Sequence, residues 1–358
     1  MPDLIIVGGG LAGIRAAALA EEHNIDYLLV ESEEVLGGAL RYPLQRRGYK
    51  MDIPSNVLLD STVLSLSPRV CKVLSEGGVS ELNFKAAIVA TGSRDVNWAE
   101  LYISGTRPAG VFTSTMLWRF MEMGYLPGFR TVVLGHLEPA IFVVEDLLEQ
   151  GVEVVLVTPH NVEHSLNVET YRGYTVGRIL GKRRVEGVVL ARSDKYEVPL
   201  NISGPFIKAD SVVLAVGYRP LITIRMFELA TPNAEPISLR DPQNNGIFFI
   251  GGALAPFKSL GGVLASVDLV FREVLSYLEG EGRSEAWIEV RAGPGVDFVL
   301  PKKIPTGRPV NILFSLKGKA DYLVVEELGE KFRVDKVEDV LRLEGLSENL
   351  AHITLRAV

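Results

Sequence analysis

The feature that most constrains this chain is its amino-terminal stretch, residues 4–31. Residues 4–7 form a short apolar run, long enough for one buried strand. A glycine turn with G-x-G-x-x-G spacing comes next, made by Gly8, Gly10 and Gly13. The alanine-rich residues 14–22 predict a helix, and a second apolar run ends at Glu31. A strand, a glycine turn, a helix, a second strand and a terminal acid together indicate a bound dinucleotide.

Each glycine has a separate role in such a turn. Gly8 permits the tight turn, Gly10 lets a pyrophosphate approach the backbone, and Gly13 lets the helix pack closely on the strand. The N–H groups at the start of the helix favour phosphate, and Glu31 would accept hydrogen bonds from a ribose diol. Residues 36–38 predict a second close approach to the same pyrophosphate. The alternative is a structural glycine turn in which Glu31 forms a salt bridge.

Composition narrows the class of protein. A chain of 358 residues can hold two or three domains, and a net charge of −7 argues against nucleic acid as the main partner. No apolar run reaches membrane-spanning length and the first strand begins at once, so we expect no signal peptide, no transmembrane helix and a cytoplasmic location. The single cysteine, Cys71, allows no intrachain disulfide or redox pair, and we expect it to be packed in a strand. The presence of only three glutamines points to a thermophilic source.

The segment after the first unit is basic, and two interpretations of it remain open. Residues 41–50 hold three arginines and a lysine and no acid, which fits either a solvated loop or an anion or partner site beside the cofactor. Residues 57–90 then predict three short strands. The last strand ends at Ala90, Thr91 and Gly92, where small residues would admit an adenosine or ribityl group.

A second strand–turn–helix–strand unit follows, with strands expected over 130–134 and 152–157 and a helix over 140–150. Its turn keeps only the first glycine, and Leu137, Glu138 and Pro139 replace the open positions. An isobutyl group, a carboxylate and a missing N–H donor all disfavour phosphate, so we expect this unit to bind no NAD(P). His160 and His164 lack further ligands nearby and predict no metal site.

Several stretches resemble the flavoprotein family with two dinucleotide-binding domains. They are GGGLAG (8–13), ATGSR (90–94), the long stretch 104–135, AVGYRP (215–220) and GIFFIGG (246–252). The chain most resembles oxidoreductases related to those accompanying anaerobic glycerol-3-phosphate dehydrogenase. The resemblance implies an α/β fold with two Rossmann-like, three-layer ββα domains, the second inserted in the first. We expect an FAD domain over 1–108 and 236–282, a degenerate NAD(P)-type domain over 109–235, and a C-terminal β module over 283–358.

The resemblance also implies which residues contact FAD. They are Gly8, Gly10, Leu11, Ala12, Gly13, Glu31, Ser32, Gly38, Val63 through its backbone at the adenine, Ala90, Thr91, Gly92, Gly251, Gly252 and Gly262. Gly252 stands where the family usually has Asp or Asn, and the short segment 38–57 lacks the family's cysteine-bearing helix. Near the flavin the sequence offers Lys258 and Phe257, although an exposed lysine is the simpler interpretation. The helix after Gly262 would turn its N-terminus toward the flavin, and no catalytic residue can be assigned.

Three hypotheses about function follow. The first is an FAD-dependent oxidoreductase or electron-transfer subunit, reduced by a substrate or a partner dehydrogenase subunit within an oligomer. The second is an NAD(P)H-dependent flavin reductase with a non-standard nicotinamide site. The third is a non-catalytic subunit of a dehydrogenase complex, with or without flavin.

Overall fold

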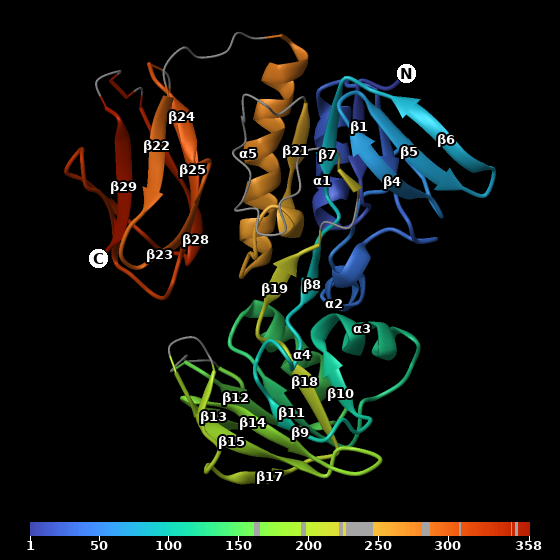
Figure 1. The fold of residues 1–358 in the computed structure, drawn as a ribbon, viewed down its shortest axis with the longest axis vertical. Coiled ribbons are helices and arrows are strands. Elements are labelled where there is room, and N and C mark those ends of the chain that lie inside the picture. Colours follow the sequence, from blue (N-terminus) through green and yellow to red (C-terminus); the bar gives the residue numbers. More distant parts are fainter. Residues whose placement is uncertain are drawn as a thin grey trace. The chain divides into compact units, whose positions relative to one another are not determined.

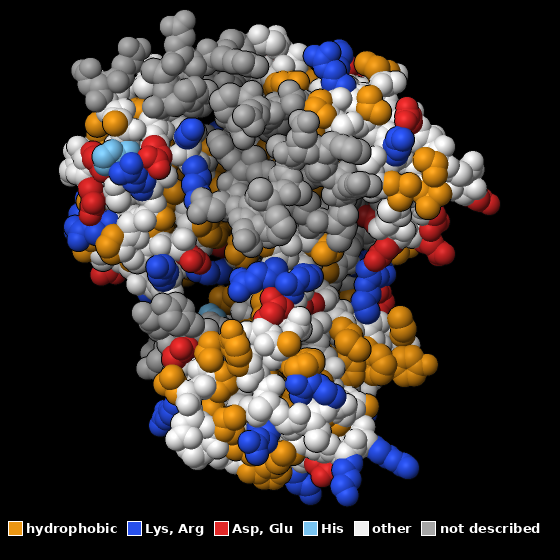
Figure 2. Space-filling model, viewed as in Figure 1, with side chains coloured by type: hydrophobic (Ala, Val, Ile, Leu, Met, Phe, Trp, Pro, Cys, Tyr) orange, Lys and Arg blue, Asp and Glu red, His pale blue; other side chains and the backbone are white. Residues whose placement is uncertain are grey.

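The computed structural model describes residues 1–160, 165–194, 198–221, 225–226, 246–280, 287–307, 309–344, 346–347 and 350–358. The chain divides into two compact units (Figure 1). Unit 1 comprises residues 1–38, 51–93 and 220–358, and unit 2 comprises 39–50 and 94–219. Acidic and basic side chains lie beside one another on the face shown in Figure 2. Among the described residues, no helix has both the length and the apolar character needed to cross a membrane.

Unit 1 is built on a parallel sheet with the strand order β21-β7-β1-β2-β3. Its strands are β1 (Leu4–Val7), β2 (Tyr27–Val30), β3 (Val57–Leu58), β7 (Ala86–Val89) and β21 (Ile247–Phe249). Their apolar side chains are almost all buried, as expected for a parallel sheet that is covered on its faces. The helices of this unit are α1 (Leu11–Glu22) and α5 (Leu260–Leu278), with a 3₁₀ turn, η2 (Gly251–Ala253), before α5.

Two further β structures belong to unit 1. A mixed sheet with the order β20-β4-β5-β6 joins β4 (Thr62–Ser67), β5 (Val70–Ser75), β6 (Gly78–Asn83) and β20 (Arg225–Met226); β20 runs parallel to β4, and the other pairs are antiparallel. Cys71 lies in β5 and is 1% exposed, which confirms that it is a packed side chain. The first of the three strands predicted over 57–90 is divided into β3 (Val57–Leu58) and β4.

The C-terminal β module consists of two sheets with a core of their own. The first has the order β24-β22-β29-β26-β27 and the second β23-β25-β28. The strands are β22 (Trp287–Ala292), β23 (Val296–Leu300), β24 (Lys303–Pro305), β25 (Val310–Leu316), β26 (Tyr322–Val325), β27 (Glu330–Arg333), β28 (Glu338–Leu343) and β29 (His352–Ala357). Leu300 and Leu313 join the core of the parallel sheet of unit 1, so the module packs against that core.

Unit 2 repeats the Rossmann-like pattern with the parallel order β10-β18-β11-β12-β13. These strands are β10 (Val111–Thr113), β11 (Arg130–Leu134), β12 (Glu153–Thr158), β13 (Glu169–Arg172) and β18 (Ser211–Leu214). The helices are α2 (Arg41–Arg46, after the 3₁₀ turn η1, Gly38–Leu40), α3 (Ser114–Glu122) and α4 (Glu138–Glu149). The mixed α/β class with Rossmann-like sheets is therefore confirmed.

The remaining strands of unit 2 form a second sheet with the order β16-β15-β14-β9, and β17 pairs with β15. They are β9 (Ser104–Gly105), β14 (Tyr174–Leu180), β15 (Gly187–Ser193), β16 (Pro199–Asn201) and β17 (Phe206–Lys208). The short strands β8 (Ser93–Asp95) and β19 (Tyr218–Pro220) pair where the chain passes between the units.

Candidate dinucleotide site

The three glycines of the first turn differ in the space around them. Gly8 has a φ of +108°, and a Cβ built on it would lie 2.5 Å from the carbonyl oxygen of Ala90. A Cβ on Gly13 would collide with the carbonyl oxygen of Gly8. A Cβ on Gly10, in contrast, would meet no atom within 4 Å. Gly8 and Gly13 are therefore required by packing, whereas Gly10 borders open space.

Gly10 is also the N-cap of α1. Its φ of −75° and ψ of −175° are extended, it provides no side-chain cap, and its carbonyl oxygen accepts the Ile14 N–H at 2.9 Å. The first turn of α1 contains no acid, and it includes Leu11 and Ala12, whose side chains are buried. An uncapped helix N-terminus beside open space is the geometry that binds phosphate in dinucleotide sites.

The acid at the end of β2 holds the turn together. Glu31 is 8% exposed, and its Oε2 accepts the Gly9 N–H at 2.5 Å. Its Oε1 accepts the Ser32 hydroxyl at 3.1 Å and the Glu33 N–H at 2.8 Å. A carboxylate oxygen has two acceptor positions, so Oε2 keeps capacity for a hydroxyl donor such as a ribose. Glu31 therefore fixes the turn and can still accept a ligand hydrogen bond.

Residues 36–38 lie directly against the glycine turn. The Gly37 N–H donates to the Gly9 carbonyl oxygen at 2.8 Å. Gly38 has a φ of +57°, and a Cβ on it would lie 3.1 Å from the Gly10 Cα. The Leu36 side chain fills the position that a Cβ on Gly9 would need. The second close backbone approach that the sequence predicts is thus made to the turn itself.

The carboxyl ends of β7 and β21 border the same region. The Thr91 hydroxyl donates to the Leu221 carbonyl oxygen at 2.6 Å, next to the buried Ala90. Gly92 has a φ of +74° and open space around its missing Cβ. Gly251 has a φ of +56°, and a Cβ on it would lie 2.7 Å from the Cβ of Ala12, so η2 adjoins the start of α1. The ends of β7 and β21 therefore adjoin the start of α1, with open space at Gly92.

The structure shows what surrounds two further residues that we expect to contact FAD, Gly252 and Val63. A Cβ on Gly252 would lie 2.9 Å from the Ser93 hydroxyl oxygen, so glycine here is explained by the close approach of β8. Val63 is buried in the core of unit 1, next to an irregularity in the β4–β5 register. Its role at an adenine remains a prediction.

The start of α5 is occupied by the C-terminal β module. A Cβ on Gly262 would collide with the carboxylate of Glu338 in β28. The Lys258 ammonium pairs with Asp297 at 2.8 Å and donates to the Leu316 carbonyl oxygen at 2.7 Å, and Phe257 packs against Phe298 at 5.6 Å between ring centroids. The contacts of Lys258 and Phe257 thus reach into this module, so Lys258 is not a free surface lysine, and its role near a flavin remains a prediction.

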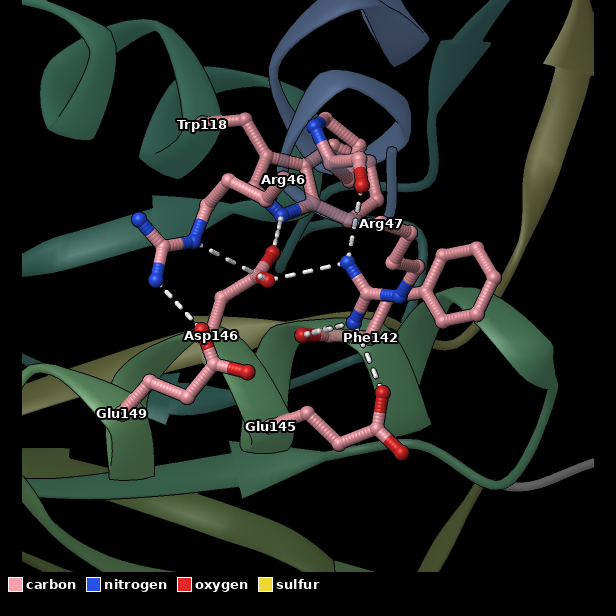
Figure 3. Close-up of polar contacts among 8 residues, drawn as sticks. Arg46, Arg47, Trp118, Phe142, Glu145, Asp146 and Glu149 are labelled. Atoms are coloured by element: carbon pink, nitrogen blue, oxygen red, sulfur yellow. Dashed lines mark hydrogen bonds and ion pairs between the residues drawn. The ribbon is translucent and has the colours of Figure 1, made fainter. Parts of the chain in front are cut away.

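The interpretation of residues 41–50 as a solvated loop is wrong, because residues 41–46 form α2 within unit 2 and the arginines of the segment are paired with acids. Figure 3 shows the pairs of Arg46 and Arg47. Arg47 donates to Asp146 at 2.9 Å and to Glu145 at 2.7 Å. Arg46 pairs with Glu149, and Arg41 binds Glu122 through two nitrogens at 2.7 and 2.8 Å. These carboxylates neutralise the three arginines, which removes the basis for an anion site.

Asp146 is the centre of that cluster, and it is 1% exposed. Its Oδ2 also accepts the Trp118 indole N–H at 2.9 Å. Burial raises the pKa of Asp146 above its usual range, although the Arg47 guanidinium acts in the opposite direction. The sequence carried one signal for this residue: an acid at a helical spacing that places it among apolar residues of α4.

The turn between β11 and α4 repeats the strand–turn–helix arrangement of the first glycine turn, but different residues begin its helix. Leu137 is the N-cap of α4, Glu138 lies in the first turn, and Pro139 follows. The rings of His136 and His160 meet edge to face at 4.6 Å between centroids. No group of metal-ligating residues was found among the described residues, and His164 lies outside them.

Comparison with known proteins supports this site. Residues 6–74 match the model of an NAD(P)-binding Rossmann-like domain. A bilirubin reductase from Mediterraneibacter gnavus is 28% identical over 228 residues, which is 61% of this chain and 34% of that protein. The chain therefore spans about a third of the length of this curated relative. The matching domain model covers the first glycine turn and is described as NAD(P)-binding. It therefore gives no support to the expectation that the chain binds no NAD(P).

Solved structures show the same architecture. An L-proline dehydrogenase from P. horikoshii superposes with a TM-score of 0.53 at 20% identity, over 79% of this chain and 56% of that one. A thioredoxin reductase from Lactococcus lactis superposes with a TM-score of 0.59 at 17% identity, over 78% of this chain and 100% of that one. At such identities the likeness is one of fold. The narrower resemblance to flavoproteins accompanying glycerol-3-phosphate dehydrogenase remains a prediction.

Proposed function

We propose that this chain is an FAD-dependent oxidoreductase that holds the cofactor at the first glycine turn. The observation that carries the proposal is the open space at Gly10, beside the uncapped N-terminus of α1 and the buried Glu31. The backbone N–H groups of the first turn would bind the pyrophosphate, and Glu31 would bind the ribose. Bound FAD would supply the redox chemistry.

In this proposal, the other described residues of the site orient the cofactor and supply no acid or base. The adenosine half lies on the β2 side of the turn in this arrangement, since Glu31 ends that strand. The other half then extends over the ends of β7 and β21, where Gly92 leaves open space. We further propose a partner dehydrogenase subunit as electron donor, an oligomeric assembly and a cytoplasmic location.

A second candidate is an NAD(P)H-dependent reductase. The matching domain model is described as NAD(P)-binding, and the curated relative is named a reductase. The N-terminus of α4 disfavours a nicotinamide dinucleotide in unit 2, because Glu138 adds a negative charge and Pro139 removes an N–H donor. A reductase of this kind would hold NAD(P)H elsewhere, or would hold it at the first turn.

An absorption spectrum of the purified protein, followed by anaerobic titration with NADH and then NADPH, tests these functions. The proposal predicts a flavin spectrum, or its recovery after adding FAD, with slow bleaching by either nucleotide. Fast bleaching would favour the reductase. A colourless protein that takes up no FAD but binds NADH would assign the first turn to NAD(P), and one that binds neither would support a non-catalytic subunit.

A further inference from the structure

Glu338 connects the C-terminal β module to the start of α5. It is the first residue of β28 and is 6% exposed. Its Oε1 accepts the Lys258 N–H at 2.9 Å, and its Oε2 accepts the Ser259 N–H at 3.2 Å and the Ser259 hydroxyl at 2.8 Å. Ser259 is the N-cap of α5 and accepts the Gly262 N–H at 3.1 Å. The carboxylate thus lies directly on the N-terminus of a 19-residue helix.

The charge of Glu338 compensates the positive end of that helix. The first turn of α5 contains no acid of its own. The nearby Lys258 ammonium has a separate carboxylate partner, Asp297, at 2.8 Å. Burial raises the pKa of Glu338 above its usual range, and the N–H and hydroxyl donors act in the opposite direction. A helix N-terminus carries roughly half a positive elementary charge, which one ionised carboxylate more than offsets.

The start of α5 also adjoins the proposed cofactor site. Gly251 in η2 packs against Ala12 in the first turn of α1, and η2 precedes α5 by a few residues. The sheet order β21-β7-β1-β2 places β2 and Glu31 on one side of the glycine turn and β7 and β21 on the other. Since Glu31 takes the ribose side, the redox-active half of a dinucleotide extends toward β21, η2 and α5.

We infer that Glu338 is a residue of the C-terminal β module that tunes the redox potential of the bound cofactor, which rests on the proposed function above. A helix N-terminus favours negative charge nearby, and a reduced flavin gains negative charge. Glu338 cancels this effect and so makes reduction of the cofactor less favourable. The C-terminal β module therefore has an electrostatic role toward the proposed cofactor site.

The test is the midpoint potential of the FAD-loaded full chain, measured by dye equilibration for wild type, Glu338→Gln, Glu338→Asp and Glu330→Gln. Glu338→Gln should favour reduction by about tenfold, which is about 30 mV upward for a two-electron couple. Glu338→Asp keeps the charge and should leave the potential unchanged. Glu330 is exposed in the same module, so Glu330→Gln is the matched control for the loss of one charge.

Two results would overturn the inference. One is a potential of Glu338→Gln equal to that of wild type, and the other is an equal shift in Glu338→Asp, which would indicate packing and not charge. If Glu338→Gln does not fold, Lys258→Met decides: removing this cation should lower the potential, and no change would refute the electrostatic role. A wild-type chain that binds no flavin would instead refute the proposed function.

Discussion

Replacing Gly10 by alanine should separate ligand binding from folding. The backbone of Gly10 is extended and its missing Cβ faces open space, so alanine fits without strain. Alanine is a poorer N-cap than glycine, which we expect to lower the free energy of unfolding by about 1 kcal/mol at most. The added methyl group would keep the pyrophosphate away from the first turn of α1. Loss of two charge-assisted hydrogen bonds of roughly 1.5–3 kcal/mol each weakens FAD binding by roughly 10²- to 10⁴-fold.

Gly13→Ala should behave in the opposite way. Its Cβ would collide with the Gly8 carbonyl oxygen, so α1 must move away from β1. Such overpacking costs about 1–3 kcal/mol of folding free energy or more. Gly318→Ala is the control, because its Cβ would meet no atom within 4 Å and it lies in the C-terminal β module.

The assay combines urea unfolding of the FAD-free proteins with FAD titration followed by flavin fluorescence. Gly10→Ala should unfold near the wild-type midpoint yet lose FAD, and Gly318→Ala should match wild type in both measurements. Wild-type FAD affinity in Gly10→Ala would refute the phosphate site at α1. Equal unfolding midpoints for Gly13→Ala and wild type would refute the packing argument.

Three further predictions concern charge and burial. Arg47→Met leaves the buried Asp146 without its closest cation and should lower the unfolding free energy by about 3–5 kcal/mol. Arg46 lies 3.9 Å from Asp146 and pairs more closely with the exposed Glu149, so Arg46→Met should cost less, about 1 kcal/mol; urea unfolding measures both. Burial raises the pKa of Cys71 from 9.0 to about 11, so the thiol ionises at a lower pH in the unfolded chain than in the folded one. The free energy of unfolding should therefore fall as pH rises above about 9, and thiol labelling at pH 8 should follow global unfolding only. Glu31→Gln loses a charged acceptor for the Gly9 N–H and should weaken FAD binding about tenfold or more in the same titration, and an unchanged affinity would exclude a ribose contact.

The first Rossmann-like unit was predictable because its signals are local. The strand, the glycine turn and the helix follow one another within residues 4–22, and Gly8 and Gly13 are explained by atoms of neighbouring elements. The second unit was found for the same reason, by the repeat of a strand, a turn and a helix. The strands β24 and β28 are not predicted from the sequence: β24 has only three residues, and in β28 the buried Glu338 and the exposed Val340 reverse the usual pattern of buried apolar and exposed polar residues.

The role of residues 39–50 could not be predicted, because it depends on pairing across the sequence. Arg47 is 99 residues from Asp146 and Arg41 is 81 residues from Glu122. The sequence shows a run of basic residues, but their acidic partners are distant in the sequence and come close only in the fold. Glu338 is a similar case: it is 79 residues from Ser259, and nothing beside it in the sequence distinguishes it from a surface acid.

The helix N-termini give a physical reason to expect a ligand at α1. In α3, Asp95 accepts the Ser114 hydroxyl at 2.5 Å and the Thr115 N–H at 3.4 Å. Glu138 lies in the first turn of α4, and Glu338 lies at the start of α5. Among the described residues, no carboxylate accepts an N–H of the first turn of α1, since Glu31 binds Gly9 outside the helix. In α3, α4 and α5 a carboxylate of the protein thus balances the positive end of the helix, whereas α1 leaves it for an anion such as a dinucleotide pyrophosphate.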